Sequence, residues 1–526
     1  MRDHVIAVDV GTGSARAGVV SADGRLLSRR EHPIHMRSSG GDVAEYSSEQ
    51  IWNATALAVR DALASARMTA DRIAAIAFDA TCSLVLRDTA GKPLVLSEED
   101  GLAFDTIAWL DHRAVREAEE VTATGHGLLA HSGEMLSPEM QMPKLMWLKR
   151  NRPDLWKKSG HFFDLSDFLT WKSTGSTARS LCTLTSKWNF ASHEEQGWNR
   201  HFLAGIGLDD LMIRGSLPPT AVPVGEPVGT LSEGAAAALG LDAGIAVAPG
   251  MIDAYAGALG VLGGAAGNRE ALRRQAALIG GTSSCLICFS PTPNFGRSLW
   301  GPFRDAVFPG QWLVEAGQSA TGGLLNHLIR VHSAGGEPTT ERHQEVIARV
   351  QALRAAEGDR FADQINILPD FHGNRSPFAD PTLKGVISGL TLDSSFDGLC
   401  RLYWRACVAI ALGLRQILDY MHNRGFHSDE LLVTGGHVKN PLLVELYGDV
   451  TGCTLTIPQT DDAVLIGTAI NAAAAARLHP DLAAAGSAMV TGGRTRPVNL
   501  EKRALYDVDY ARFLLMQRHR AELKGM

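Results

Sequence analysis

Two aspartates stand out because each follows an apolar run and lies beside glycines. Asp9 interrupts HVIAVDVGTGSARAGVV (4–20) just before a Gly-Thr-Gly-Ser turn, and Asp253 follows VAPGMI and precedes AYAGALG. Glycines at a strand end let a ligand approach the backbone, whose N–H groups can bind an anion. An acid beside a phosphate-binding turn implies a metal, and an acid in a glycine-rich cleft suits the general base for a hydroxyl.

Each aspartate also has a simpler structural interpretation. Asp9 could cap the N–H groups of its own turn, and Asp253 could be the N-cap of the helix that follows it. Position alone leaves both interpretations open. The chain has no Gly-x-x-x-x-Gly-Lys-Ser/Thr, and residues 11–18 lack Gly-x-Gly-x-x-Gly, so a P-loop and a dinucleotide-binding turn are excluded.

The first turn has a counterpart about 270 residues later. Gly281-Thr282-Ser283-Ser284 also lies between two apolar runs, in AALIGGTSSCLICFS, and a third turn at Gly435-Gly436 separates a strand from a helix. A repeat of this length is too long for a solenoid, so we expect two similarly built domains facing one another. Their three glycine turns could together hold a triphosphate across a cleft.

The remaining patterns supply the elements around these turns. Short β-type runs fill 5–10 and 15–20, a hairpin passes through Asp23-Gly24, and residues 74–96 repeat the strand, turn, strand pattern. Helical spacing follows between 112 and 172, and a long helix is expected over 397–425. ELLVTGGHVKNPLLVELYGDVTGCTLTI predicts strand, turn, helix, strand. Together they predict an α/β protein of mixed sheets covered by helices.

Composition narrows the class of protein. The 526 residues are 45% apolar and 20% charged, with net charge −7 and no Lys/Arg-rich run, which argues against nucleic acid as a partner. Arg2, Asp3 and Asp9 interrupt any signal-peptide core, so we expect a cytoplasmic protein. The apolar stretch 244–267 contains a proline, an aspartate and seven glycines, and is predicted to be strand, loop and helix rather than a membrane span. The seven scattered cysteines suggest reduced core thiols, and the C-L-I-C at 285–288 lacks the further partners of a zinc site.

Several separated motifs, in order, resemble the FGGY carbohydrate kinases over about residues 4–515: DVGTGSARAG, WLDHRA, GMIDAYAG, GGTSS, EAGQSATGG, GNRSPFADPTLKG and TGGHVKNPLLVELYGDVTG. The resemblance implies two actin-like, ribonuclease-H-like domains, each a mixed five-stranded-type sheet flanked by helices, with a cleft between them. We expect a sugar-binding domain at 1–262 and a nucleotide-binding domain at 275–526. The role of the segment 263–277 between them cannot be read from the sequence.

The resemblance also implies roles for individual residues. Asp9 would belong to the Mg²⁺·ATP site and Asp253 would be the catalytic base. The implied sugar contacts are Thr81, Cys82, Trp109, Asp111, Lys187, Asp253 and Glu315. The implied ATP contacts are Gly11, Thr12, Gly13, Ser14, Gly281, Thr282, Gly322, Gly435, Gly436 and Asn440. Alternatively, Trp109 could be a core residue, and Lys187 and Glu315 could form a surface pair.

Within the family, DATCSLVLRD, LTSKWNF and DFHGNRSPFADPTLKGVISGLTLD look most like the D-ribulose kinases of the ribulokinase-type branch. The triplet Thr81-Cys82-Ser83 is the most telling, because one residue beside a sugar can change the choice of epimer. L-ribulose, ribitol or glycerol as substrate stay open, as does a non-catalytic sensor or an assembling actin-like ATPase. A homodimer is the default expectation for a soluble enzyme.

Overall fold

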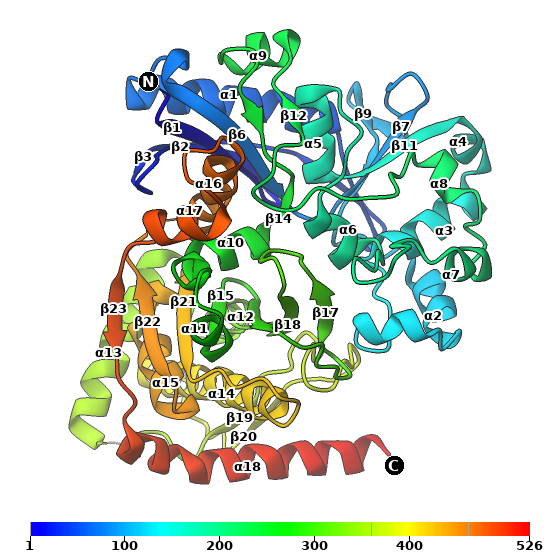
Figure 1. Ribbon diagram of the computed structural model, residues 1–526. Helices are drawn as coiled ribbons and strands as arrows, with labels where there is room; N and C mark the ends of the chain where they lie inside the picture. Colours follow the sequence, from blue (N-terminus) through cyan, green and yellow to red (C-terminus); the bar gives the residue numbers. More distant parts are fainter. Residues whose placement is uncertain (1, 359, 461, 526) are drawn as a thin grey trace.

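The computed structural model describes residues 2–358, 360–460 and 462–525, so the outer ends of the two predicted domains, residues 1 and 526, lie outside it. Two seven-stranded sheets, one in each half of the chain, dominate the fold (Figure 1). The first has the order β12-β13-β6-β1-β2-β3, with β14 also paired to β6. Its strands are β1 His4–Val10, β2 Ser14–Ser21, β3 Leu26–Pro33, β6 Ile73–Ala80, β12 Gly229–Thr230, β13 Ala246–Val247 and β14 Met251–Ile252.

The second large sheet has the order β17-β18-β16-β15-β21-β22-β23. Its strands are β15 Gln275–Gly280, β16 Ser284–Ser290, β17 Trp300–Arg304, β18 Trp312–Gln318, β21 Glu430–Gly435, β22 Thr454–Pro458 and β23 Gly493–Arg496. In both sheets the first strand of the half pairs antiparallel with the next strand and parallel with a later one. The predicted repeat is therefore real. Each five-strand core is extended to seven, by β12 and β14 in the first sheet and by β17 and β23 in the second.

The predicted strand, turn, strand pattern over residues 74–96 is confirmed, but its two strands do not pair with each other. Residues 74–96 contain two strands, but β6 stays in the first large sheet, whereas β7 (Leu84–Asp88) enters a separate sheet of order β11-β7-β10-β5-β4. The segment 81–83 between them carries the chain from one sheet to the other rather than closing a hairpin. The other strands of this sheet are β4 Met36–Ser39, β5 Val43–Tyr46, β10 Thr106–Ile107 and β11 Ser159–Asp164. Two small pairs complete the strands: β8 Ser97–Glu99 with β9 Leu102–Phe104, and β19 Asn366–Leu368 with β20 Val386–Ser388.

Helices surround the sheets, and most predicted helices are confirmed. The first half contains α1 Ser48–Ala66, α2 Val115–Ala123, α3 Gln141–Asn151, α4 Pro153–Lys158, α5 Leu165–Thr174, α6 Leu181–Lys187, α7 Arg200–Gly205, α8 Leu211–Arg214, α9 Glu233–Leu239 and α10 Asp253–Leu262. The second half contains α11 Arg269–Arg274, α12 Gly322–Val331, α13 Thr340–Glu357, α14 Phe396–His422, α15 Pro441–Thr451, α16 Ala463–Ala475, α17 Leu482–Met489 and α18 Leu500–Lys524. Short 3₁₀ turns are η1 Ala70–Arg72, η2 Gly127–His131, η3 Gly263–Ala265 and η4 Gly436–Lys439. In the described part of the chain, every helix is too short or too polar to cross a bilayer.

Alternation along β1 explains how the first sheet is covered on both faces. Ile6, Val8 and Val10 point into the core beneath α1, and Val5 and Ala7 point into the core that contains α10 and α16. Asp9 therefore shares the face of Val5 and Ala7. The chemistry of the first turn must lie on the side of these two helices.

The helices α10 and α16 cross between the two large sheets (Figure 1). α10 follows the first sheet in sequence but packs on β15 of the second, and α16 comes late in the chain but packs on β1 and β6 of the first. They touch through glycines: a Cβ on Gly260 would lie 1.8 Å from the carbonyl oxygen of Ala463, and one on Gly467 would lie 1.8 Å from that of Ala256. The crossing joins the halves backbone to backbone.

Candidate active site

Three residues form one row across the first sheet. Asp9 on β1 lies opposite Arg16 on the antiparallel β2 and opposite Asp79 on the parallel β6. A guanidinium nitrogen of Arg16 lies 3.1 Å from Oδ2 of Asp9. Asp79 accepts a hydrogen bond from the hydroxyl of Thr468 on α16. The sheet and the crossing helix therefore place two carboxylates and one cation at the first glycine turn.

These carboxylates resist ionisation. Burial raises the pKa of Asp9 to about 7, with Asp253 and Asp462 acting in the same direction and Arg16 opposing them. Burial and the neighbouring Asp9 also raise the pKa of Asp79 well above its usual range. A cation placed here would stabilise the ionised forms, because opposite charge lowers a carboxyl pKa.

The donor set fits a magnesium ion that keeps most of its own oxygen shell. Oδ1 of Asp9 and Oδ1 of Asp79 are buried and have no hydrogen-bond donor among the described residues, and Oδ2 of Asp9 is held by its ion pair with Arg16. The described part of the chain nevertheless contains no cluster of three acids, histidines or cysteines that could enclose a metal alone. Mg²⁺ is commonly held by one or two carboxylates together with water and phosphate oxygens. Asp9 would hold the ion in this way. Its carboxylate does not cap the N–H groups of its own turn.

Asp253 is the first residue of α10, and the N-cap is Ile252 rather than Asp253. Its Oδ1 accepts a hydrogen bond of 2.7 Å from the backbone N–H of Ala254. Burial raises the pKa of Asp253, and Glu315 adds to that rise, whereas the Ala254 N–H, Lys187 and Arg16 lower it. Asp253 thus lies within electrostatic reach of both the Asp9 row and the Lys187–Glu315 group.

Lys187 and Glu315 are both buried, so they are not a surface pair. Lys187 ends α6, and its ammonium lies 5.1 Å from the ring centre of Trp300 on β17. Glu315 on β18 accepts a 3.2 Å hydrogen bond from the hydroxyl of Tyr255. Burial lowers the pKa of Lys187, but the surrounding thiol and carboxyl groups outweigh it and the net pKa is raised. The two halves of the chain therefore contribute opposite charges to one buried site.

A small pocket adjoins this site and is lined from both halves. Ser186 and Lys187 come from the first half, and Trp300 and Phe303 from the second. Its lining combines aromatic rings with an ammonium and hydroxyl groups, so this part of the site offers both apolar and hydrogen-bonding contacts.

Four predicted sugar contacts lie on the side of the first sheet. The backbone N–H of Thr81 donates to the carbonyl of Val10, which ties the Thr81-Cys82-Ser83 segment to the end of β1. Burial raises the pKa of the Cys82 thiol to about 11 and keeps it neutral. Trp109 is half-buried rather than a core residue, and its indole N–H donates to the Thr12 hydroxyl at 3.1 Å.

The carboxylate of Asp111, unlike the side chains of the other three residues, is already used in several hydrogen bonds within the protein. Its carboxylate accepts from the backbone N–H of Ala44 at 2.6 Å and from Arg113 Nε at 2.9 Å. These bonds order the loop that carries Trp109, and a direct contact of Asp111 with a sugar stays a prediction.

The predicted ATP contacts of the second half are mainly backbone groups. Gly322 donates its N–H to the carbonyl of Gly281 at 3.1 Å, and the N–H of Thr321 donates to the carbonyl of Thr282 at 2.9 Å. Gly435 has a φ of 82°, and a Cβ on it would lie 2.4 Å from the carbonyl oxygen of Gly280. The structure therefore packs together the predicted turns at 281–282, 322 and 435–436. Asn440 caps α15 through Leu442 N–H at 3.1 Å and donates to Tyr403 at 3.1 Å.

His437 joins these turns, and the sequence analysis did not single it out. Its Nε2 lies 3.0 Å from the Gly281 carbonyl oxygen and 3.0 Å from the Thr321 hydroxyl, and its Nδ1 lies 2.8 Å from the Tyr447 hydroxyl. Burial lowers the pKa of His437 to about 4, so the ring is neutral. A carbonyl can only accept, so Nε2 carries the proton and Nδ1 accepts from Tyr447.

Asp79 and Arg375 were missed as well. Asp79 follows an apolar run, AAIAF, as Asp9 does, and this parallel could have found it. Arg375 lies within the quoted GNRSPFADPTLKG motif, but only the fold shows that it reaches Glu315, 3.5 Å away.

Comparisons with known proteins agree with this architecture. The model of the FGGY family of carbohydrate kinases, N-terminal domain, matches residues 4–260, and that of the C-terminal domain matches residues 276–476. The chain belongs to the FGGY family of carbohydrate kinases, and it is a phosphotransferase that acts on a sugar.

Individual relatives and solved structures show which members of the family the chain is similar to. The chain is 39% identical to a human FGGY carbohydrate kinase domain-containing protein, covering 99% of this chain and 97% of that protein. It is 35% identical to a D-ribulokinase of Saccharomyces cerevisiae, covering 89% of this chain and 71% of that protein. The crystal structure of xylulose kinase from Rhodospirillum rubrum superposes with a TM-score of 0.82 at 22% identity, covering 99% of this chain and all of that one, and shares the two-domain fold.

Proposed function

We propose that the protein transfers the γ-phosphoryl group of Mg²⁺·ATP to the terminal hydroxyl of D-ribulose. The observation that carries the proposal is the position of Asp253 at the start of α10, within electrostatic reach of the Asp9 row on one side and of the Lys187–Glu315 group on the other. The 35% identity to a yeast D-ribulokinase supports the choice of sugar.

In this mechanism Asp253 accepts the proton of the O5 hydroxyl as that oxygen attacks the γ-phosphorus in line and ADP leaves. Magnesium bound to the phosphates would supply charge neutralisation as negative charge develops on them. Asp9 would hold the ion, the turns after β1 and β15 would bind phosphate oxygens through N–H groups, and the Gly435-Gly436 turn would lie near the nucleoside. Lys187, Glu315, Thr81 and Trp109 would orient the sugar. Such a reaction depends mainly on positioning, so Asp253 need not be strongly basic.

The test is ADP release from Mg²⁺·ATP with D-ribulose, L-ribulose, D-xylulose, ribitol and glycerol offered separately. We expect a clear preference for D-ribulose. Asp253→Asn should lower kcat by about 10²–10⁴-fold, the usual contribution of a general base. Sugar binding, followed by calorimetric titration, should persist in this variant.

Other outcomes would overturn parts of the proposal. Preference for another sugar or polyol would correct the substrate and leave the kinase. If none of them raised turnover above the sugar-free rate, the sugar that the enzyme phosphorylates would lie outside this set. Near-normal turnover in Asp253→Asn would remove Asp253 as the base.

We further propose that the domain ranges 1–262 and 275–526, a cytoplasmic location and a homodimer describe the working enzyme. Light scattering of the purified protein tests the dimer: a mass near 56 kDa would contradict it, since that is the mass of one chain.

A further inference from the structure

The segment 369–385, between β19 and β20, carries Arg375 into the candidate sugar site. A guanidinium nitrogen of Arg375 donates to Sγ of Cys285 at 3.3 Å and lies 3.5 Å from Oε1 of Glu315. The guanidinium also lies over the ring of Trp300, 4.5 Å from its centre. Trp300 is thereby in contact with two cations, since Lys187 lies 5.1 Å from the same ring centre.

Within the described residues, the side-chain hydrogen bonds of Arg375 use one nitrogen, Nη1. A guanidinium has five N–H donors and no acceptor, so Nη2 and Nε can donate to oxygen atoms. A ketose offers such oxygens in its carbonyl and hydroxyl groups. Arg375 is therefore suited to bind the sugar rather than merely to neutralise Glu315.

The other side of this loop is held by the last turns of α18, which lies along the edge of the second half (Figure 1). Arg520 forms an ion pair of 2.5 Å with Asp370 and donates to the carbonyl oxygen of Lys384 at 2.9 Å. Lys524 forms an ion pair of 2.7 Å with Asp380. The family model ends at residue 476, so these contacts come from a part of the chain beyond it.

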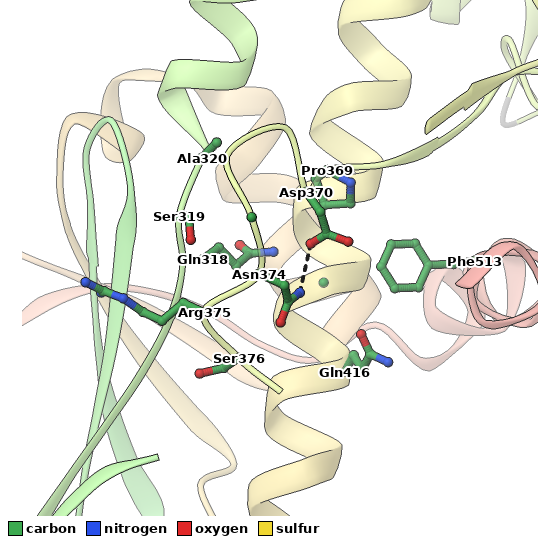
Figure 2. A pocket seen from close by; sticks show the side chains of 12 residues that line it. Gln318, Ser319, Ala320, Pro369, Asp370, Asn374, Arg375, Ser376, Gln416 and Phe513 are labelled. Atoms are coloured by element: carbon green, nitrogen blue, oxygen red, sulfur yellow. Dashed lines mark hydrogen bonds between the residues drawn. The ribbon is translucent and has the colours of Figure 1, made fainter. Parts of the chain in front are cut away.

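Inside the loop, hydrogen bonds connect the two sides. Figure 2 shows Asp370 accepting a hydrogen bond from the side-chain amide of Asn374, at 2.8 Å, and Asn374 directly precedes Arg375. The backbone of Asn374 exchanges two hydrogen bonds of 2.9 Å with Asp380. Both acids that α18 holds, Asp370 and Asp380, thus bond to Asn374.

We propose that Arg375 is a sugar-binding residue and that Arg520 is a positioning residue for it, acting through Asp370 and Asn374. Arg520 is only partly exposed, with 12% of its side chain accessible, so the ion pair is not a fully solvated one. Loss of this ion pair would release the loop and let Arg375 leave Glu315 and Trp300. This inference rests on the proposed sugar kinase activity.

The test compares Arg520→Gln with Arg518→Gln, a matched change on the same helix at an exposed position whose side chain forms no hydrogen bond or ion pair within the described residues. We expect Arg520→Gln to raise the KM for D-ribulose about tenfold, in line with the loss of one charged hydrogen bond, and to leave the KM for ATP unchanged. Hydrogen exchange of residues 369–385 should become faster in Arg520→Gln only. Arg375→Gln should raise the sugar KM more, about 10–100-fold.

Two further variants separate positioning from a general loss of structure. Arg520→Lys keeps the charge and should recover part of the sugar KM. The effects of Asp370→Asn and Arg520→Gln on the sugar KM should be less than additive when combined, because both changes remove the same ion pair. An unchanged sugar KM despite faster exchange would overturn the link to Arg375, and unchanged exchange would overturn the role of Arg520.

Failure of the proposed function would look different. If no sugar stimulates the wild-type protein, the sugar-binding role of Arg375 falls with it, whereas the exchange experiment still decides whether Arg520 holds the loop.

Discussion

The turn after β1 and the turn after β15 begin from the same pattern but are equipped differently. Asp9 lies in a row with Arg16 and Asp79, whereas its counterpart Ile279 lies in a row with Cys285 and Thr434. The turns also differ in length: Val10 pairs with Ala15 and Gly280 with Ser284, so the second turn is one residue shorter.

This difference shows how one scaffold can serve two purposes. The first turn gathers ionisable groups, whose pKa values burial raises. The second turn gathers backbone groups and one neutral imidazole, His437. Acids at both turns would repel the phosphates that the turns are proposed to share, so charge on one turn alone suits a metal on that side and N–H donors on the other.

The largest effect is expected where the turns differ most in charge. Asp9→Asn removes the carboxylate proposed to hold Mg²⁺, and should lower kcat about 10³-fold, since a bound metal supplies several kcal/mol of transition-state stabilisation. Steady-state ADP release over a range of Mg²⁺ concentrations measures this. The matched change Ile279→Val should stay within about threefold of wild type, because it removes one methylene and no charge. Equal losses in both variants would mean that the first turn has no special role.

Glycine-to-alanine substitutions measure how much room for a side chain each turn leaves. A Cβ on Gly280 would lie 2.1 Å from Nδ1 of His437, whereas one on Gly13 meets nothing within 4 Å. Gly280→Ala should therefore cost about 1–3 kcal/mol of stability, as overpacking does. Gly13→Ala should unfold at the same denaturant concentration as wild type. A raised KM for ATP in Gly13→Ala would then report phosphate approaching that glycine, and an unchanged KM would place the phosphates elsewhere.

His437 tests whether the second turn depends on its imidazole. His437→Ala removes the hydrogen bonds to Gly281 and Thr321 and should raise the KM for ATP about tenfold, since each such bond contributes about 1 kcal/mol. His437→Gln can restore one donor and should recover part of the loss. A change in the KM for sugar instead of ATP would contradict the assignment of this turn to the nucleotide.

The smallest expected effects are on the pH dependence of stability. With rising pH, stability is lost at the first turn and gained at the second. The pKa of Asp79 is raised on folding, so its contribution to stability is present at low pH and is lost as pH rises. The pKa of His437 is lowered to about 4, so its contribution is present above about 6.5 and is lost as pH falls towards 4. Asp79→Asn should lessen the decline in Tm on the alkaline side, and His437→Gln the decline on the acidic side. The same slope in both variants would contradict this contrast.

Local patterns predicted much of this fold. Strands β1 and β2, the hairpin to β3 and the strand–turn–helix–strand unit around Gly435 were all expected, because alternation and glycine turns are local signals. Both strands of the segment 74–96 were expected as well, but their partners were not. Strand partners depend on distant parts of the chain, and nothing in Thr81-Cys82-Ser83 shows that β7 enters another sheet. The sequence also indicated Lys187 and Glu315, through the family resemblance.

The missed residues share a different cause. Asp79 joins Asp9 only through the parallel register of β6, Arg375 reaches Glu315 across a loop, and His437 joins turns that are more than 100 residues apart. Tertiary packing decides which of these residues become neighbours, and a single sequence does not reveal such long-range contacts.

The crossing of α10 and α16 has a consequence for synthesis of the chain. The first sheet is covered on one face by α16, which begins at residue 463, so a nascent chain that has just completed β14 at residue 252 leaves that face bare. About 200 further residues must emerge before the cover exists, and at typical translation rates this takes about 10–40 s. Until then the exposed side of β1 and β6 is open to chaperones, and a fragment that ends near residue 262 would carry this apolar face permanently.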